Sequence, residues 1–310
     1  MVNRAIYEIL RLFTHQDWIR LGIRKRILDF IAKPENVGAY EFETDFFNLK
    51  YRGNLNQYID CVVYFYGAYE KQELFLIRDL MHNRVNPISL DIGANVGQHC
   101  IFMATFFDQV HAFEPFDKVR RQLYEKISIN EIDNIVVHDL GLSDESGELD
   151  YYPPKGFNTG TGSFLASKRF DSEYAVEKLI VVRGDEYISL LNLERLDFIK
   201  IDVEGFEKKV LCGLEKTLER FRPILLVEYS ELTKASFSNS AEFTSIFPSN
   251  YCVLKVTKNH AHHLVLNSPS YALKPFDFNK PGGNVCCIPG ELTNEKQIQG
   301  LIGCKLEGLT

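Results

Sequence analysis

Apolar and polar residues alternate along the middle of the chain, first with the period of a strand and then with that of a helix. Short apolar runs bounded by turn residues predict buried strands. Five such runs lie at residues 87–91, 109–113, 135–138, 196–201 and 223–228. Between them, apolar residues recur at helical spacing, as at Val119, Leu123 and Ile127. This order is typical of an α/β domain with a mainly parallel sheet. Two later runs, 251–256 and 284–288, are expected to add an antiparallel edge.

The first 66 residues have a different pattern. Residues 1–35 are expected to be helical, because apolar residues recur at helical spacing with arginine and lysine between them. Such a helix either caps the domain or lies on a membrane surface or a partner. Short strands are expected at residues 39–47, 49–51 and 62–66. The expected units are a helical and short-strand N-terminal extension, an α/β domain and a C-terminal tail, at residues 1–66, 67–290 and 291–310.

Residues 141–185, called the insertion below, interrupt the alternation of helices and strands. Strands are expected at residues 148–152 and 179–182. Residues 153–169 are rich in glycine, proline, serine and threonine, which predicts a loop. A polar loop of this length is either a lid over a binding site or a solvated hairpin.

Composition narrows the classes of protein that fit. The 310 residues include 35 lysines and arginines against 42 acids, and the net charge of −7 disfavours broad binding to nucleic acid or to an anionic membrane. No apolar run approaches the ~18 residues of a membrane span, and no signal-peptide pattern is present. The seven cysteines are odd in number and form no CxxC pair, which favours free thiols in a reducing compartment. A cytoplasmic protein is therefore expected.

A glycine-containing turn follows the first strand of the α/β domain. Residues 91–97 read Asp-Ile-Gly-Ala-Asn-Val-Gly, and we call residues 93–97 the glycine loop. Its glycines permit a tight turn and a close approach, and the N–H groups at the following helix start are expected to be free to meet an anion. The spacing D-x-G-x-x-x-G differs from the G-x-G-x-x-G of dinucleotide-binding folds, and no P-loop lysine follows.

A second acid supports a nucleoside ligand. Glu114 ends the next strand, 21 residues beyond Gly93 (114 − 93), where a carboxylate can accept both hydroxyls of a ribose. The two features together predict a ligand of the adenosine type. They leave NAD and S-adenosylmethionine open, and the loop spacing favours S-adenosylmethionine.

A third motif completes a resemblance to a known family. Residues 199–207 read Ile-Lys-Ile-Asp-Val-Glu-Gly-Phe-Glu, a strand that ends on an acid and turns into a helix. With residues 91–97 and 113–115 (Phe-Glu-Pro), this segment resembles the hallmarks of the FkbM-type methyltransferases in order and spacing. The resemblance covers about two-thirds of the chain. It implies a class I, Rossmann-like S-adenosylmethionine-dependent methyltransferase fold, a mostly parallel seven-stranded sheet with one antiparallel strand, and methyl transfer that is commonly to oxygen.

The resemblance also implies roles for individual residues. The methionine end of the cofactor should be held by Asp91, Gly93, Ala94, Asn95 and Gly97. Glu114 should hold the ribose, Asp139 lies on the adenine side by position, and Asp202 should face the methyl group and the acceptor. His99 departs from the residue expected there. It either contacts the cofactor carboxylate or lies on the helix surface.

Three acids at strand ends are candidates for the chemistry. Asp202 is expected to act as a general base or to orient the cofactor's amino group. Glu204 is either a second catalytic acid or a cap on the following helix, and Glu228 is a weaker candidate. A metal site is not expected. The histidines of residues 259–263 fit an exposed hairpin loop, and the Asp-Asn pair of cation-dependent O-methyltransferases is absent beside Glu228.

The function expected from these observations is S-adenosylmethionine-dependent O-methylation. The acceptor is expected to be a small molecule or glycan, and the suggestion of a sugar rests on the resemblance alone. A nucleic-acid acceptor is disfavoured by the charge. The alternatives are an amine or protein acceptor, and a cofactor-binding module without catalysis. The acceptor, the oligomeric state and the pathway stay open.

Overall fold

The fold is organised around one eight-stranded sheet. The computed structural model describes residues 4–16, 22–23, 26, 39–154, 162–165, 176–258 and 271–302. The strand order is β12-β11-β13-β10-β9-β3-β4-β5. Five neighbouring strands run parallel: β3 (Ile88–Ile92), β4 (Gln109–Phe113), β5 (Ile135–His138), β9 (Phe198–Ile201) and β10 (Ile224–Glu228). Every predicted strand of this domain is present.

The edge beyond β10 is antiparallel, as expected. It consists of β13 (Asn284–Pro289), β11 (Tyr251–Lys258) and β12 (Tyr271–Pro275), each antiparallel to its neighbour. The expected count of seven strands is wrong by one, because β12 adds a further edge strand. Only one of its five residues is buried, so its apolar pattern is too weak to predict a strand.

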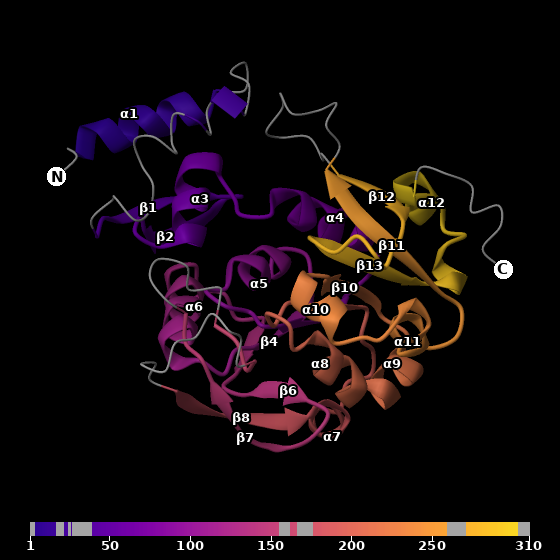
Figure 1. Cartoon of the computed structure of the whole chain (residues 1–310). Coiled ribbons are helices and arrows are strands. Elements are labelled where there is room, and N and C mark those ends of the chain that lie inside the picture. Colours follow the sequence, from indigo (N-terminus) through magenta and orange to yellow (C-terminus); the bar gives the residue numbers. More distant parts are fainter. Residues whose placement is uncertain are drawn as a thin grey trace.

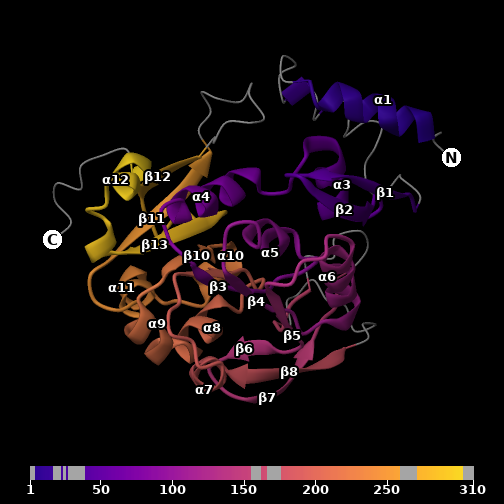
Figure 2. The ribbon, with the colours of Figure 1, turned by 180° about the vertical axis from the view of Figure 1, so that it is seen from behind.

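Helices cover both faces of the sheet. Figures 1 and 2 show α4 (Lys71–Met81) and α5 (Gln98–Met103) on one side, and α8 (Glu207–Gly213) and α9 (Glu215–Phe221) on the other. The pleat divides each strand between two cores, so Phe198 of β9 packs on the α4–α5 side while Ile199 packs on the α8–α9 side. The remaining elements of the domain are α6 (Asp117–Ile129), α7 (Gly184–Leu190), α10 (Glu231–Ala235), α11 (Ser240–Ser245), η3 (Gly290–Leu292) and α12 (Lys296–Ile302).

The N-terminal extension packs beside α5 and α6 (Figure 1). It contains α1 (Arg4–Thr14), the antiparallel pair β1 (Glu41–Phe46) and β2 (Leu49–Asn54), and α3 (Tyr58–Tyr66). The strand predicted at residues 62–66 is wrong, because this segment is the second half of α3. Its β-branched and aromatic residues suggest a strand, but burial of Val63, Tyr64 and Phe65 against the extension's core stabilises a helix instead.

The insertion forms its own three-stranded sheet of β6 (Gly141–Ser143), β8 (Glu177–Arg183) and β7 (Gly147–Tyr151), in that order. Residues 162–165 of the predicted loop are described, and the rest of it from residue 155 onward lies outside the described residues. Residues 259–263, the histidine segment, also lie outside them. Among the helices that the structure describes, none has the length and apolar character needed to cross a bilayer.

Candidate active site

The glycines of the loop allow close packing between parts of the protein. Gly93 and Gly97 have φ values of +84° and +89°, a conformation that glycine adopts without strain. A Cβ at Gly93 would lie 2.0 Å from the carbonyl oxygen of Asp202, and one at Gly97 would lie 2.5 Å from Leu123 Cδ1 of α6. The first glycine therefore joins the loop to the end of β9, and the second joins it to α6.

The N–H groups of the glycine loop have acceptors inside the protein. The pairs are Gly93 N and Ala94 N with Phe113 O (3.0 and 3.1 Å), Asn95 N with Glu114 Oε2 (2.9 Å), Val96 N with Asn95 Oδ1 (2.8 Å) and Gly97 N with Ala94 O (3.0 Å). These amides of residues 93–97 are thus used inside the protein, and the expectation of free N–H groups at the start of the following helix, which begins at Gln98, stays a prediction. The following helix α5 begins only at Gln98, because this turn occupies the preceding residues.

Glu114 connects the glycine loop to the end of β4. Its side chain is buried and accepts N–H groups from Asn95 and Phe116, both at 2.9 Å. Burial raises the pKa of Glu114 to about 7, although these two hydrogen bonds favour the charged form. Glu114 does not line the pocket described next, and neither does Asp139, which is exposed after β5. The ribose and adenine roles of these two residues stay predictions.

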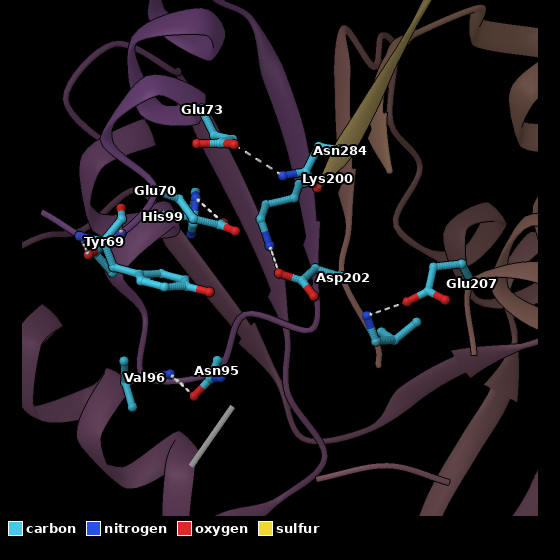
Figure 3. Close-up of polar contacts among 12 residues, drawn as sticks. Tyr69, Glu70, Glu73, Asn95, Val96, His99, Lys200, Asp202, Glu207 and Asn284 are labelled. Carbon is cyan, nitrogen blue, oxygen red and sulfur yellow. Dashed lines mark hydrogen bonds and ion pairs between the residues drawn. The ribbon is translucent and has the colours of Figure 1, made fainter. Parts of the chain in front are cut away.

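A pocket that is partly open to solvent lies at the carboxyl ends of β3, β9 and β10. Such an edge is the usual ligand site of an open parallel sheet. Its lining comes from the glycine loop, the ends of β9 and β10, the segment before α4, and helices α5 and α3: Gly93, Ala94, Asn95, Val96, Lys200, Asp202, Glu204, Glu228, Tyr69, Glu70, Gln98, His99 and Ile59. Figure 3 labels seven of these residues, from Tyr69 and Glu70 to Lys200 and Asp202. The structure thus places the predicted Asp202, Glu204, His99 and most of the glycine loop around one cavity.

Lys200 is a buried cation that the sequence interpretation passed over. Its ammonium lies 2.9 Å from Asp202 Oδ2, and its side chain is 3% exposed (Figure 3). Burial disfavours the ammonium, but the carboxylates of Asp202, Asp91 and Glu70 outweigh this and raise the pKa of Lys200. A signal was present, because residues i and i+2 of a strand share a face and this lysine precedes an acid by two positions.

Asp91 lies beside Lys200 in the sheet, as its register partner on β3. It is fully buried, and neither carboxylate oxygen has a hydrogen-bond partner among the described residues. Burial raises the pKa of Asp91 to about 6, and the Lys200 ammonium opposes that rise. Asp91 is not among the residues that line the pocket, so its predicted contact with the cofactor stays a prediction.

The two other strand-end acids are partly desolvated. Glu204 follows β9 with a left-handed φ of +52°, and burial, Asp202 and Glu207 raise its pKa to about 8. At the end of β10, burial and the negative charge of Asp202 also raise the pKa of Glu228. Glu228 Oε2 is buried without a hydrogen-bond partner among the described residues. A cation or a hydrogen-bond donor in the pocket would satisfy these groups.

His99 faces the pocket and not the helix surface. Its side chain is buried, and Nε2 lies 3.6 Å from Glu70 Oε2. Burial and the Lys200 ammonium hold the pKa of His99 well below its ordinary value, so the imidazole is neutral at neutral pH.

A reciprocal pair of hydrogen bonds positions Tyr69, which sequence interpretation did not single out. Gln98 Oε1 accepts the Tyr69 N–H at 2.7 Å, and Gln98 Nε2 donates to the Tyr69 carbonyl at 2.8 Å. Figure 3 shows the Tyr69 ring extending from this anchor toward Asp202. Because these contacts join residues that are 29 positions apart in the sequence, no local sequence pattern predicts them.

In the described part of the chain, no group of three or more histidine, cysteine, aspartate or glutamate side chains is arranged to hold a metal ion.

Comparison with known proteins identifies the family. Residues 91–253, just over half of the chain, match the model of the methyltransferase FkbM domain. The chain therefore belongs to the FkbM methyltransferase family, and the resemblance drawn from the three motifs is confirmed.

Curated relatives include named methyltransferases. The chain is similar to the 2-O-methyltransferase NoeI of Sinorhizobium fredii (28% identity, 47% of this chain and 64% of that protein). It is equally similar to the hexuronic acid methyltransferase AglP of Haloferax volcanii (28% identity, 48% and 63%). The chain thus matches a little less than two thirds of each relative's length. Among solved structures, the methyltransferase FkbM of Methylobacillus flagellatus aligns with a TM-score of 0.40 at 17% identity, over 65% of this chain and 43% of that one.

Proposed function

We propose that this protein is an S-adenosylmethionine-dependent methyltransferase that methylates a hydroxyl group of a sugar, a glycan or another small metabolite. The observation that carries the proposal is the shared pocket, in which the glycine loop and the acids at the ends of β9 and β10 face one cavity. Family membership supports methyl transfer. The name of NoeI, a 2-O-methyltransferase, supports transfer to oxygen, and the name of AglP, a hexuronic acid methyltransferase, supports a sugar-like acceptor.

The residues of the pocket fit this cofactor. A sulfonium and an ammonium group need negative partners, and the pocket supplies Asp202 and the unsatisfied Glu228 Oε2. The cofactor supplies an electrophilic methyl group when it is bound. The segment Ala94–Asn95–Val96 is the loop surface exposed to it, and Glu114 would hold the ribose through lone pairs that its two backbone hydrogen bonds leave free.

Two acids are assigned the removal of the acceptor's proton and the positioning of the cofactor. A base is most effective when its pKa lies near the working pH, and Glu204, with a pKa of about 8, meets this condition. We assign to Glu204 the removal of the acceptor's hydroxyl proton. Asp202 has Oδ2 bonded to Lys200, which fixes its orientation and suits it to positioning the cofactor. This assignment gives the base role to Glu204 and the orienting role to Asp202.

The test combines binding and product mass. S-adenosylhomocysteine and NAD are titrated into the protein by calorimetry, and the protein is then incubated with S-adenosylmethionine and a panel of neutral glycans, uronic acids, hydroxylated metabolites, amines and proteins. We expect binding of S-adenosylhomocysteine alone, and a mass gain of one methyl on a hydroxylated acceptor. Glu204→Gln should abolish most turnover and keep binding, whereas the exposed-acid control Asp133→Asn should behave as wild type. Absence of S-adenosylhomocysteine binding would overturn the proposal.

A further inference from the structure

Residues 162–165 of the insertion lie against the turn that carries Glu204. The Ser163 hydroxyl donates to the Glu204 carbonyl oxygen at 2.9 Å and accepts the Leu165 N–H at 3.0 Å. The hydroxyl has one proton, and this proton is donated to Glu204 because a carbonyl oxygen can only accept. Ser163 itself is buried.

Ser163 is held firmly in this place. Its N–H and carbonyl form both hydrogen bonds of a bridge with Tyr152, at 3.1 and 2.9 Å, directly after β7. A Cβ at Gly162 would lie 1.8 Å from the Tyr151 hydroxyl, so a larger residue next to Ser163 would require the buried Tyr151 side chain to shift. The serine is thus fixed to the insertion's own sheet and not only to the turn that it contacts.

Apolar contacts press the same segment onto the turn. The Phe164 ring lies 5.2 Å from that of Phe206 and 5.3 Å from that of Tyr151. A Cβ at Gly205 would lie 2.8 Å from Leu165 Cδ1. At this turn, Glu204 lines the pocket, whereas Gly205 and Phe206 pack against the insertion.

The turn needs such support because Glu204 has a left-handed backbone with a φ of +52°, a conformation that is unfavourable for a residue other than glycine. Glu207 Oε1 accepts the N–H groups of Val203 and Gly205, at 3.0 and 3.2 Å, and holds the turn from the other side. The Glu204 carbonyl is held by Ser163.

We propose that Ser163 is a positioning residue that fixes the Glu204 carboxylate in the pocket, which makes the insertion a working part of the active site. This inference rests on the proposed function, in which Glu204 is the base. A misplaced base loses rate while the cofactor contacts, made by other elements, are kept.

Kinetics test the coupling. Ser163→Ala should lower kcat about 10-fold to 100-fold, leave the Kd for S-adenosylhomocysteine within about 2-fold, and be restored by Ser163→Thr. In a Glu204→Gln background the same change should have no further effect on kcat. The matched control is Ser146→Ala, which removes a hydroxyl of the same insertion that accepts the Arg183 N–H. Wild-type kcat in Ser163→Ala, or an equal loss in the Glu204→Gln background, would overturn the proposal.

A second measurement needs no acceptor and so separates this inference from the proposed function. The Glu204 carboxyl is followed by ¹³C NMR across pH, with Glu204→Gln for assignment. In Ser163→Ala, the Glu204 carboxylate should move toward solvent, and its pKa should therefore fall. An identical titration in wild type and Ser163→Ala would refute positioning even if no acceptor is found. If Ser163→Ala does not fold, Ser163→Cys, a weak donor of similar size, takes its place in both experiments.

Discussion

The Cα of Gly93 packs against the carbonyl oxygen of Asp202 so closely that a Cβ on Gly93 would lie 2.0 Å from that oxygen. The Asp202 N–H donates in turn to the carbonyl of Ile92, at 3.0 Å, so the ends of β3 and β9 are joined by a hydrogen bond and by direct packing. Two motifs 109 residues apart (202 − 93) thus form one structural unit. Gly93 therefore serves this contact in addition to lining the pocket.

Gly93→Ala should therefore destabilise the protein as well as weaken cofactor binding. The φ of +84° costs alanine about 1–2 kcal/mol, and the clash with backbone adds about 1–3 kcal/mol more. Gly282→Ala is the matched control, because Gly282 has a φ of +102° with open space around its Cβ position. Chemical denaturation of both variants isolates the clash. Equal losses would contradict the packing role of Gly93.

Replacing Glu114 should affect the glycine loop and the ligand together. Glu114→Ala leaves the N–H groups of Asn95 and Phe116 without their acceptor, at about 1–3 kcal/mol each. If Glu114 also holds the ribose, the affinity for S-adenosylhomocysteine should fall about 10-fold to 100-fold. Denaturation and calorimetry measure the two effects separately. Lower stability with unchanged affinity would leave Glu114 as a support of the loop alone.

The Lys200–Asp202 pair should show strong coupling. Asp202→Asn leaves a buried ammonium short of a charged partner, an arrangement that costs about 3–5 kcal/mol in fully buried pairs, and less here because Asp202 is 27% exposed. Lys200→Met in the same chain removes the cation that needs the partner, so the double variant should be less destabilised than the sum of the single ones. A double-mutant cycle by chemical denaturation measures this, and additive losses would contradict it. Kinetically, Asp202→Asn should raise the KM for the cofactor more than it lowers kcat.

The parallel strands were predictable because both faces of each are buried. Ile199 and Ile201 pack on one side of β9 while Phe198 packs on the other, which produces a short continuous apolar run. The acids at the strand ends could be placed by the same logic, since carboxyl ends of parallel strands meet at one edge. The strand prediction for residues 62–66 failed because burial in the folded protein stabilises a helix there, although these residue types favour strands.

The rest of the pocket depends on contacts between distant segments. Gln98 fixes Tyr69 through side-chain bonds to its backbone, and Ser163 contacts Glu204 across 41 residues. Neither pairing leaves a periodic trace in the sequence. The internal use of the loop amides was equally hidden, because it requires the positions of Phe113 and Glu114 in the adjacent strand.

The rate of methyl transfer should depend on the ionisation of Glu204. Because burial raises its pKa to about 8, kcat/KM for the acceptor should rise about tenfold per pH unit below that pH and level off above it. The measurement is initial rate against pH at saturating cofactor. Glu204→Gln should remove this limb, whereas the exposed control Asp133→Asn should keep it. A limb that survives in Glu204→Gln would assign the proton transfer to another group.

A chain of neutral side chains links Tyr187 of α7 to Gln109 of β4 through His138 and His111. Tyr187 lies 3.0 Å from His138 Nδ1, His138 Nε2 lies 3.0 Å from His111 Nδ1, and His111 Nε2 lies 3.2 Å from Gln109 Oε1. One proton per contact, donated from Tyr187 through the two imidazoles to Gln109, satisfies every group. This arrangement requires both rings to be neutral. Burial accordingly lowers the pKa of each histidine to about 4.

Acid should therefore destabilise the protein through this pair. The folded pKa of about 4 is below the unfolded value of 6.5, so the unfolded state binds more protons between these limits. The free energy of unfolding should be unaffected by this pair above pH 6.5 and fall as the pH drops, by about 3 kcal/mol at pH 4 for one histidine.

His138→Gln should reduce this fall in the free energy of unfolding relative to wild type, and the exposed control His82→Gln should not. Buried acids such as Asp91 have raised pKa values and act in the opposite direction, but they are common to all three proteins and cancel in the comparison. Parallel pH profiles for wild type and His138→Gln would show that the pair does not titrate on unfolding.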